Sequence, residues 1–285
     1  MSHNNQKKIA VINDFSGFGR CSIAVALPIL SVMKVQCCPL PTAYLSTHTG
    51  GFTGYTFLDM TDALPATTAH WAELGIHFDA VYTGFMGSEA QMDLVADFVR
   101  TFRRDASTLF ICDPVMGDHG KIYKTYTPAM CAGMTRLAAL ADVVVPNLTE
   151  AAVLLGEDYS FGAQTHDEAG YRRSVERLSL GGKRSVVLTG VTLRKGEIGA
   201  CLFDRERGET EFLFDEFVGK EFHGTGDLFA SVLTGALVRG KGLHSAVQLA
   251  EFFVRECALH TMPQKLPSRE GVDFEPLLWK LHEGL

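Results

Sequence analysis

The stretch His223-Gly-Thr-Gly-Asp227 runs directly into the apolar segment Leu228-Phe-Ala-Ser-Val-Leu-Thr-Gly-Ala-Leu-Val238. The two glycines allow a tight backbone turn, and the apolar run after them predicts a buried helix. The first turn of a helix has amide groups without an intrahelical partner and the positive end of the helix dipole. We therefore expect Gly224, Thr225 and Gly226 to gather their N–H groups around an anion such as a phosphate.

Asp227 follows these residues, where a carboxylate would face the same anion. An acid in this place can withdraw a proton from a hydroxyl group that attacks a phosphate. An aspartate near a helix start also occurs for ordinary capping and dipole reasons. The stretch taken alone leaves both interpretations open.

Upstream of this stretch, short apolar runs alternate with helical patterns. Helices are predicted over residues 21–33 and 88–103, and strands over residues 9–12, 80–82, 108–112, 143–145 and 185–188. This alternation predicts a mostly parallel sheet covered by helices on both faces. Ligands bind beyond the carboxyl ends of such strands. A polar residue follows each of four predicted strands at this edge of the sheet: Asp14, Asp113, Asn147 and Thr189. Four polar residues at the same edge indicate a ligand site.

The remaining segments have weaker patterns. Residues 198–204 and 211–217 predict an antiparallel hairpin that leads to the glycine loop, and residues 245–260 and 274–282 look helical. Residues 42–57 have the weakest pattern for regular structure, and we expect either a loop over a small flat ligand or a surface connection. No repeat or long linker divides the chain, so residues 1–285 are expected to form a single domain.

Composition and charge exclude several classes of partner. The chain has 285 residues, of which 46% are hydrophobic, and 26 basic against 33 acidic residues give a net charge of −7 without a basic cluster. This excludes nucleic acid as an expected partner. Seven cysteines without a Cys-x-x-Cys pair indicate reduced core cysteines. Apolar runs too short for a signal peptide or a membrane span predict a soluble, cytoplasmic protein with no membrane partner.

Two carboxylates lie close together in Asp113-Pro-Val-Met-Gly-Asp118, directly after a predicted strand. Proline fixes one backbone angle and glycine permits a sharp reversal, so both carboxylates can face a hydrated Mg²⁺ that also touches phosphate oxygens. Plain turn formation is the alternative.

A second motif, Asn147-Leu-Thr-Glu150, opens a predicted helix. Asn147 and Glu150 have the spacing of a helix capping pair, which requires no function. If they face a nucleotide instead, Glu150 would bind magnesium through water and Asn147 would orient the phosphates. Both interpretations remain open at this stage.

The order of these motifs resembles the ribokinase-like superfamily, and closely its pyridoxal kinase branch, over nearly the whole chain. The resemblance rests on Asp113-Pro-Val-Met-Gly-Asp118, Asn147-Leu-Thr-Glu150, Gly224-Thr-Gly-Asp-Leu-Phe229, His48-Thr-Gly and the Thr-Gly pairs at 83 and 189. It implies a three-layer α/β/α fold with a mostly parallel central sheet. It also implies ATP-dependent phosphorylation of the 5′-hydroxymethyl group of pyridoxal, pyridoxine or pyridoxamine, usually by a homodimer using Mg²⁺ and often K⁺.

The resemblance also implies roles for individual residues. Asp227 resembles the catalytic base, and Gly224, Thr225 and Gly226 resemble the anion hole. Thr189 is expected near the phosphates, and the Mg-ATP group comprises Asp113, Asp118, Asn147 and Glu150, with Asp113, Asp118 and Glu150 as metal ligands. Three residues are expected on the substrate: Asp14 in the first loop, Thr49 near the ring substituents and Phe85 stacked on the ring.

Two features depart from the pyridoxal kinase pattern. The first loop, Asp14-Phe-Ser-Gly-Phe-Gly19, is more similar to that of hydroxymethylpyrimidine kinases, and His223 before the glycine loop has no assigned role. A hydroxymethylpyrimidine kinase is therefore the nearest alternative. A non-catalytic vitamer-binding regulator on the same fold is the other, because a fold alone does not establish activity.

Overall fold

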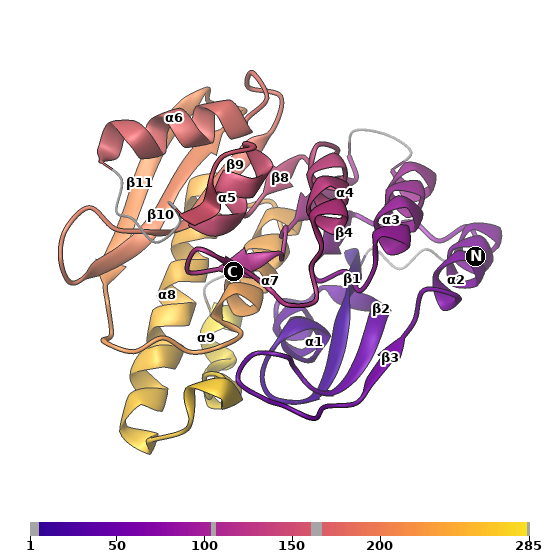
Figure 1. The fold of residues 1–285 in the computed structure, drawn as a ribbon, viewed down its shortest axis with the longest axis horizontal. Helices are drawn as coiled ribbons and strands as arrows, with labels where there is room; N and C mark the ends of the chain where they lie inside the picture. Colours follow the sequence, from indigo (N-terminus) through magenta and orange to yellow (C-terminus); the bar gives the residue numbers. More distant parts are fainter. Residues whose placement is uncertain (1–5, 104–106, 161–166, 284–285) are drawn as a thin grey trace.

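The computed structural model describes residues 6–103, 107–160 and 167–283 (Figure 1). A nine-stranded sheet runs through it in the order β11-β10-β9-β8-β5-β4-β1-β2-β3, and β6 and β7 form a separate hairpin. The strands are β1 (Lys8–Phe18), β2 (Gln36–Thr47), β3 (Phe57–Asp59), β4 (Ala80–Thr83), β5 (Leu109–Cys112), β6 (Gly117–Asp118), β7 (Lys121–Ile122), β8 (Val143–Val144), β9 (Ser185–Val191), β10 (Glu197–Asp204) and β11 (Glu209–Glu216).

The six central strands pair in parallel, and the antiparallel pairs lie at the two ends of the sheet. Successive residues of β1 face opposite sides, so Ile9 and Val11 join one apolar core while Ala10 and Ile12 join the other. This explains why the run is continuously apolar. The expected mostly parallel central sheet is confirmed.

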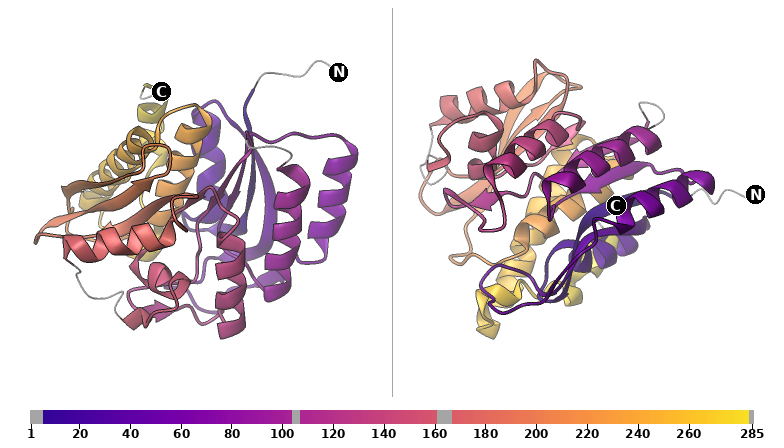
Figure 2. Two further views of the ribbon diagram at one scale, coloured as in Figure 1. Left: turned by 90° about the horizontal axis from the view of Figure 1, so that it is seen from above. Right: turned by 45° about the vertical axis from the view of Figure 1, so that its right-hand side comes forward.

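Helices cover both faces of the sheet (Figure 2). One core contains residues of α1 (Ser22–Val32), α7 (Thr225–Val238), α8 (Leu243–Thr261) and α9 (Trp279–Glu283). The other contains residues of α2 (Ala63–Glu73), α3 (Glu89–Phe102), α4 (Pro128–Ala138), α5 (Leu148–Leu154) and α6 (Glu168–Leu178). Helix α7 packs between α1 and α8, which places its N-terminus near the end of β1.

Two expectations about regular structure are wrong at the first loop. Strand β1 does not end at Asn13 but continues to Phe18, with a register irregularity between Asn13 and Phe15. Its partner β2 covers residues 42–47, where no regular structure was expected. The two strands extend together beyond the rest of the sheet, and Gly17 in β1 and Pro39 and Pro41 in β2 hide the strand pattern.

Other boundaries also differ from the expectations. The pattern over residues 274–282 is divided into a 3-10 turn (Glu275–Leu277) and the short helix α9, and α2, α4 and α6 were not predicted. All seven cysteines are free, as expected. Within the described residues, none of the helices combines the length and the apolar character that a bilayer span requires.

Candidate active site

Helix α7 begins in the glycine loop, and its first turn is open. Its N-cap residue Gly224 has a φ of 78°, and no side chain caps the helix. A Cβ atom at Gly224 would lie 1.8 Å from the carbonyl oxygen of Arg20, so only glycine fits here. The N-cap residue thus supplies no side-chain acceptor to the first turn of α7, where the dipole favours an anion. The expected anion site at Gly224, Thr225 and Gly226 stays a prediction.

Asn13 holds the carboxyl group of Asp227, with 3.2 Å between Asn13 Nδ2 and Asp227 Oδ1. The Asn13 Oδ1 atom accepts two backbone N–H groups, from Asp14 at 2.9 Å and from Phe85 at 2.7 Å. These two donors fix the orientation of the amide, so its NH₂ group must face Asp227. The sequence analysis missed Asn13, although its place at a strand end next to Asp14 was a signal.

The first loop also lies near Asp227, since the backbone of Ser22 lowers the pKa of the Asp227 carboxyl group. Ser22 has a φ of 53°, a left-handed conformation that costs a residue with a Cβ about 1–2 kcal/mol. Its hydroxyl donates to Asp14 Oδ1 at 2.5 Å, and the Ser16 hydroxyl donates to Asp14 Oδ2 at 2.8 Å. Asp14 is buried, and burial raises its pKa. Its expected contact with a substrate stays a prediction.

The protonation of Asp227 is suited to a general base. The pKa of Asp227 is raised to about 7, mainly by burial and also by the negative charge of Asp14, although the backbone of Ser22 and the hydrogen bond from Asn13 lower it. A base is most effective when its pKa lies near the working pH. The carboxyl group of Asp227 can therefore both hold and release a proton near neutrality.

The capping interpretation of Asn147 and Glu150 is confirmed, since the two residues form a reciprocal capping box at the start of α5. The same residues also hold the hairpin of β6 and β7. Glu150 Oε1 accepts the N–H of Met116 at 3.1 Å, and Asn147 Nδ2 donates to the carbonyl of Gly117 at 2.8 Å. Helix α5 thereby fixes the segment that carries Asp118.

Asp113 and Asp118 lie in different environments. Asp113 is buried, and its carboxyl group accepts no hydrogen bond from the described residues. Burial raises its pKa well above the ordinary value, and Glu150 and Asp227 add to the increase. Asp118 is half exposed and accepts the N–H of His119 at 2.8 Å. Among the described residues, no three potential ligands form a metal-binding cluster, so the three expected magnesium ligands stay a prediction.

Among the described residues, the buried acids of the site have no lysine or arginine partner. The influences on the pKa of Asp14, Asp113 and Asp227 include no lysine or arginine. Burial raises the pKa of Glu150 to about 8, and Asp118 raises it further. Burial also raises the pKa of Tyr123, and so do the charges of Glu150, Asp118, Asp113 and Asp227. The sequence analysis missed Tyr123, which no motif marks.

The residues expected on the substrate ring lie on two segments. Phe85 is 8% exposed and its ring centroid lies 6.0 Å from that of Tyr126, so one face packs in the core. Thr49 is partly buried and follows His48. The His48 Nδ1 atom accepts the N–H of Gly50 at 3.1 Å, so its Nε2 donates to the carbonyl of Arg269 at 2.6 Å. Thr189 lies inside β9 and not beyond its end as expected, and its N–H donates to the carbonyl of Pro146 at 3.0 Å.

His223 joins the glycine loop to the loop that carries Thr49. Its ring centroid lies 5.5 Å from that of His48, and a Cβ at Gly50 would lie 2.7 Å from its Nδ1 atom. Its backbone N–H donates to the carbonyl of Ser268 at 3.1 Å. Burial lowers the pKa of both histidines, which favours their neutral forms.

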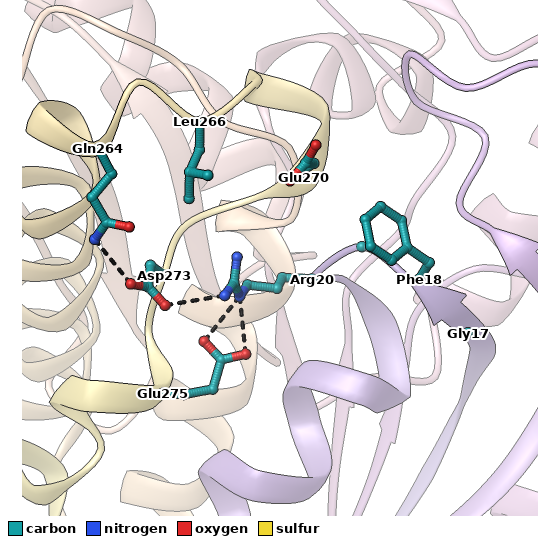
Figure 3. Close-up of a pocket in the computed structure, with 9 residues that line it drawn as sticks. Gly17, Phe18, Arg20, Gln264, Leu266, Glu270, Asp273 and Glu275 are labelled. Carbon is teal, nitrogen blue, oxygen red and sulfur yellow. Dashed lines mark hydrogen bonds and ion pairs between the residues drawn. The ribbon is translucent and has the colours of Figure 1, made fainter.

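A cavity of about 480 Å³ lies behind the first loop, between residues 17–20 and the segment 264–275 (Figure 3). Arg20 lies in it, with Nε at 2.9 Å from both carboxylate oxygens of Glu275 and Nη2 at 3.0 Å from Asp273. Asp227 does not line this cavity. These ion pairs connect the C-terminal segment to the loop whose Arg20 carbonyl lies against Gly224.

A family model described as phosphomethylpyrimidine kinase matches residues 27–268. The chain belongs to the phosphomethylpyrimidine kinase family. A solved member, a candidate phosphomethylpyrimidine kinase from Bacteroides thetaiotaomicron, is 37% identical with a TM-score of 0.92, over 99% of this chain and 96% of that chain. A second crystal form described under the same name contains pyridoxal.

This chain is also similar to pyridoxal kinases. The pyridoxal kinase from Lactobacillus plantarum is 30% identical with a TM-score of 0.87, over 98% of this chain and 97% of that chain. A candidate pyridoxal kinase from Caenorhabditis elegans is 34% identical over 55% of this chain. The chain spans about half (48%) of the length of that protein. The resemblance to the ribokinase-like superfamily and its pyridoxal kinase branch, and the three-layer α/β/α fold, are confirmed.

Proposed function

We propose that this protein transfers the terminal phosphate of ATP to the 5′-hydroxymethyl group of pyridoxal, pyridoxine or pyridoxamine. The observation that carries the proposal is the position of Asp227, an acid with a pKa of about 7 in the uncapped first turn of α7. A base and an anion site meet there within one helical turn. The similarity to a pyridoxal kinase and to a structure with bound pyridoxal supports the choice of substrate.

The geometry suggests what each residue does in the transfer. Asp227 accepts the proton of the attacking hydroxyl group, while Asn13 holds its carboxylate in place. The backbone N–H groups at the start of α7 stabilise the charge that develops on the transferred phosphate. Thr189 is proposed near the phosphates, and Thr49 and Phe85 on the ring of the alcohol. Positioning and charge stabilisation supply most of the catalysis in such a reaction.

The charge of the site supports a requirement for cations. ATP brings several negative charges to a site where no lysine or arginine among the described residues influences the pKa of Asp14, Asp113 or Asp227. The buried carboxyl group of Asp113 accepts no hydrogen bond from the described residues, and a hard cation with oxygen ligands fits such a group. We therefore propose that Mg²⁺ binds with Asp113, Asp118 and Glu150, and K⁺ is a second candidate. Bound Mg²⁺ would neutralise the phosphate charge.

The assembly and location of the protein are also proposals. Five exposed apolar side chains lie on β1, β2 and β3 at one end of the sheet: Phe15, Phe18, Tyr44, Phe57 and Leu58. Apolar surface of this kind supports a homodimer, which light scattering after size-exclusion chromatography would detect. The continuous sheet supports a single kinase domain over residues 1–285, and we propose a cytoplasmic enzyme.

The decisive test is turnover by the purified protein with ATP and Mg²⁺. Pyridoxal, pyridoxine, pyridoxamine and hydroxymethylpyrimidine are compared side by side, with ADP formation and the mass of the product as readouts. We expect a 5′-phosphate from at least one vitamer, at a higher kcat/KM than for the pyrimidine. The matching family model and the first loop favour hydroxymethylpyrimidine as the second candidate. Absence of ADP with every alcohol would support a non-catalytic binding protein instead.

A further inference from the structure

Asn13 lies between two parts of the proposed site that act on the same alcohol, the segment that carries Phe85 and the carboxyl group of Asp227. We propose that Asn13 is a positioning residue that holds both parts with one side chain, so that the hydroxyl group of a bound ring faces the base. The proposal rests on the proposed function, which puts Phe85 on the ring and makes Asp227 the base. It makes the positions of the ring and of the base depend on each other.

The side-chain amide of Asn13 makes one hydrogen bond to each part. Its Oδ1 atom accepts the backbone N–H of Phe85 at 2.7 Å, and its Nδ2 atom donates to Asp227 Oδ1 at 3.2 Å. A Cβ atom at Gly84 would lie 2.4 Å from Asn13 Nδ2, so glycine there leaves the space that the amide occupies. Asn13 is 1% exposed, and little of it is open to a ligand. Since the amide is planar, it fixes the Phe85 peptide relative to Asp227.

Thr42 holds the other side of the Phe85 backbone. Its Oγ1 atom donates to the Phe85 carbonyl at 2.9 Å, so buried side chains bond both polar groups of that backbone. The amide of Gln91 ties the same segment to β2, because its Oε1 accepts the N–H of Gly87 at 2.7 Å and its Nε2 donates to the Thr42 carbonyl at 2.8 Å. The Thr42 hydroxyl bond reaches Phe85 without involving Asp227, which makes Thr42 the natural comparison for Asn13.

Phosphate transfer depends on the relative position of these two parts. The place of the ring determines where its hydroxymethyl group lies, and the orientation of the Asp227 carboxyl group determines where the proton can go. A displacement of about 1 Å between reacting groups can lower a rate by about 10². A side chain that bonds both the Phe85 peptide and Asp227 therefore affects binding and turnover together, whereas Thr42 affects binding alone.

Asn13→Asp breaks only the bond to the base. The new carboxylate keeps an oxygen for the Phe85 N–H but has no donor for Asp227. The N–H groups of Phe85 and Asp14 stabilise its charge, so the proton that the two acids share rests on Asp227 and blocks the base. We expect kcat with pyridoxine to fall about tenfold or more. The Kd of pyridoxine, measured by calorimetry, should change by less than about twofold.

Thr42→Val breaks only the bond to the ring segment and keeps the shape of the side chain. We expect the Kd of pyridoxine to rise about fivefold, with kcat at saturating pyridoxine within about twofold of the original. Thr108→Val is the matched control, because the buried Thr108 hydroxyl donates to the Phe78 carbonyl at 3.0 Å. That bond lies at the amino ends of β4 and β5, away from the site. The control should lose similar thermal stability but keep Kd and kcat.

Asn13→Ala removes both bonds and is expected to show both effects, a Kd raised about fivefold and a kcat lowered about tenfold or more. If Asn13 instead contacted the alcohol, Asn13→Asp would weaken pyridoxine binding as much as Asn13→Ala, and the proposal would be overturned. A near-original kcat in Asn13→Asp, or an original Kd in Thr42→Val, would overturn it as well. The first result would remove the link to the base, and the second the link to the ring.

Turnover of the original chain separates this proposal from the proposed function. If that chain forms ADP with no alcohol, the proposed function is refuted, whatever the variants bind. If it phosphorylates pyridoxine and Asn13→Asp does so equally well, only the positioning role of Asn13 is refuted. Circular dichroism confirms that each variant is folded. Asn13→Asp and Thr42→Val each break a single bond, and together they test the proposal even if Asn13→Ala does not fold.

Discussion

Helices α5 and α7 both begin beside buried acids, but their first turns are capped differently. In α5, Asn147 and Glu150 cap each other and also bind the hairpin that carries Asp118. In α7, Gly224 offers no side chain. The dipole has the same sign in both helices, so the dipole alone does not make a site. A first turn is available to a ligand only where the sequence leaves its amide groups without a cap.

The largest effect is expected for Asp227, the acid in the uncapped first turn of α7. Asp227→Asn keeps the size of the side chain but removes the base, so turnover with a vitamer is expected to fall by a factor on the order of 10² or more. The measurement is kcat from ADP formation, with ATP binding by calorimetry as the control for an intact site. Near-normal turnover in a variant that binds ATP would show that Asp227 is not the base, and the contrast with α5 would lose its functional meaning.

The pH dependence of kcat/KM in the protein without substitutions also tests Asp227 as the base. Because the pKa of Asp227 is raised to about 7, its carboxyl group is protonated below that pH and cannot accept the proton of the alcohol. We expect kcat/KM to fall about tenfold per unit as the pH decreases below about 7. A profile that stays flat down to pH 5 would contradict the assignment.

Gly224→Ala tests the open start itself. The added Cβ would lie 1.8 Å from the Arg20 carbonyl oxygen at a φ of 78°, so the loop must shift. We expect the free energy of unfolding to fall by about 1 kcal/mol or more and ATP affinity to decrease. Thermal unfolding and calorimetry measure the two effects. Gly226→Ala is the matched control for stability, since no atom lies within 4 Å of its added Cβ; equal destabilisation by both would remove the steric argument.

Asn147→Ala opens the closed start of α5. Loss of an N-cap side chain costs about 0.5–2 kcal/mol, measured by denaturant unfolding. Asp167→Ala is the control, because Asp167 caps α6 in the same way, accepting the N–H of Gly170 at 2.7 Å, without touching the hairpin. Turnover should fall in Asn147→Ala only, since its amide also holds Gly117. Equal turnover in both variants would limit Asn147 to a stabilising role.

Local patterns predicted most of the fold. Continuous apolar runs such as residues 9–12 identified the central parallel strands, because both faces of such strands are buried. Residues 42–47 were missed because Pro39 and Pro41 interrupt the strand pattern before them, although Tyr44, Leu45 and Thr47 pair with the extended end of β1. Strand pairing over distance, rather than local propensity, determines that segment.

The site was predictable where a motif marks a position and not where the fold brings residues together. The glycine loop and the capping pair could be recognised from their own spacing. The contact between Asn13 and Asp227 joins residues 214 positions apart, and no local pattern encodes it. The conformation of Ser22 was equally hidden, since serine is not a residue type that marks a positive φ.

The ion pairs of Arg20 with Asp273 and Glu275 also bear on biosynthesis. They join residues 253 and 255 positions apart, so the first loop gains this support only after residues 273 and 275 have been synthesised. The strands at the centre of the sheet are translated much earlier. A chain that lacks residues 273–275 therefore lacks the ion pairs that tie Arg20, whose carbonyl lies against Gly224, to the C-terminal segment.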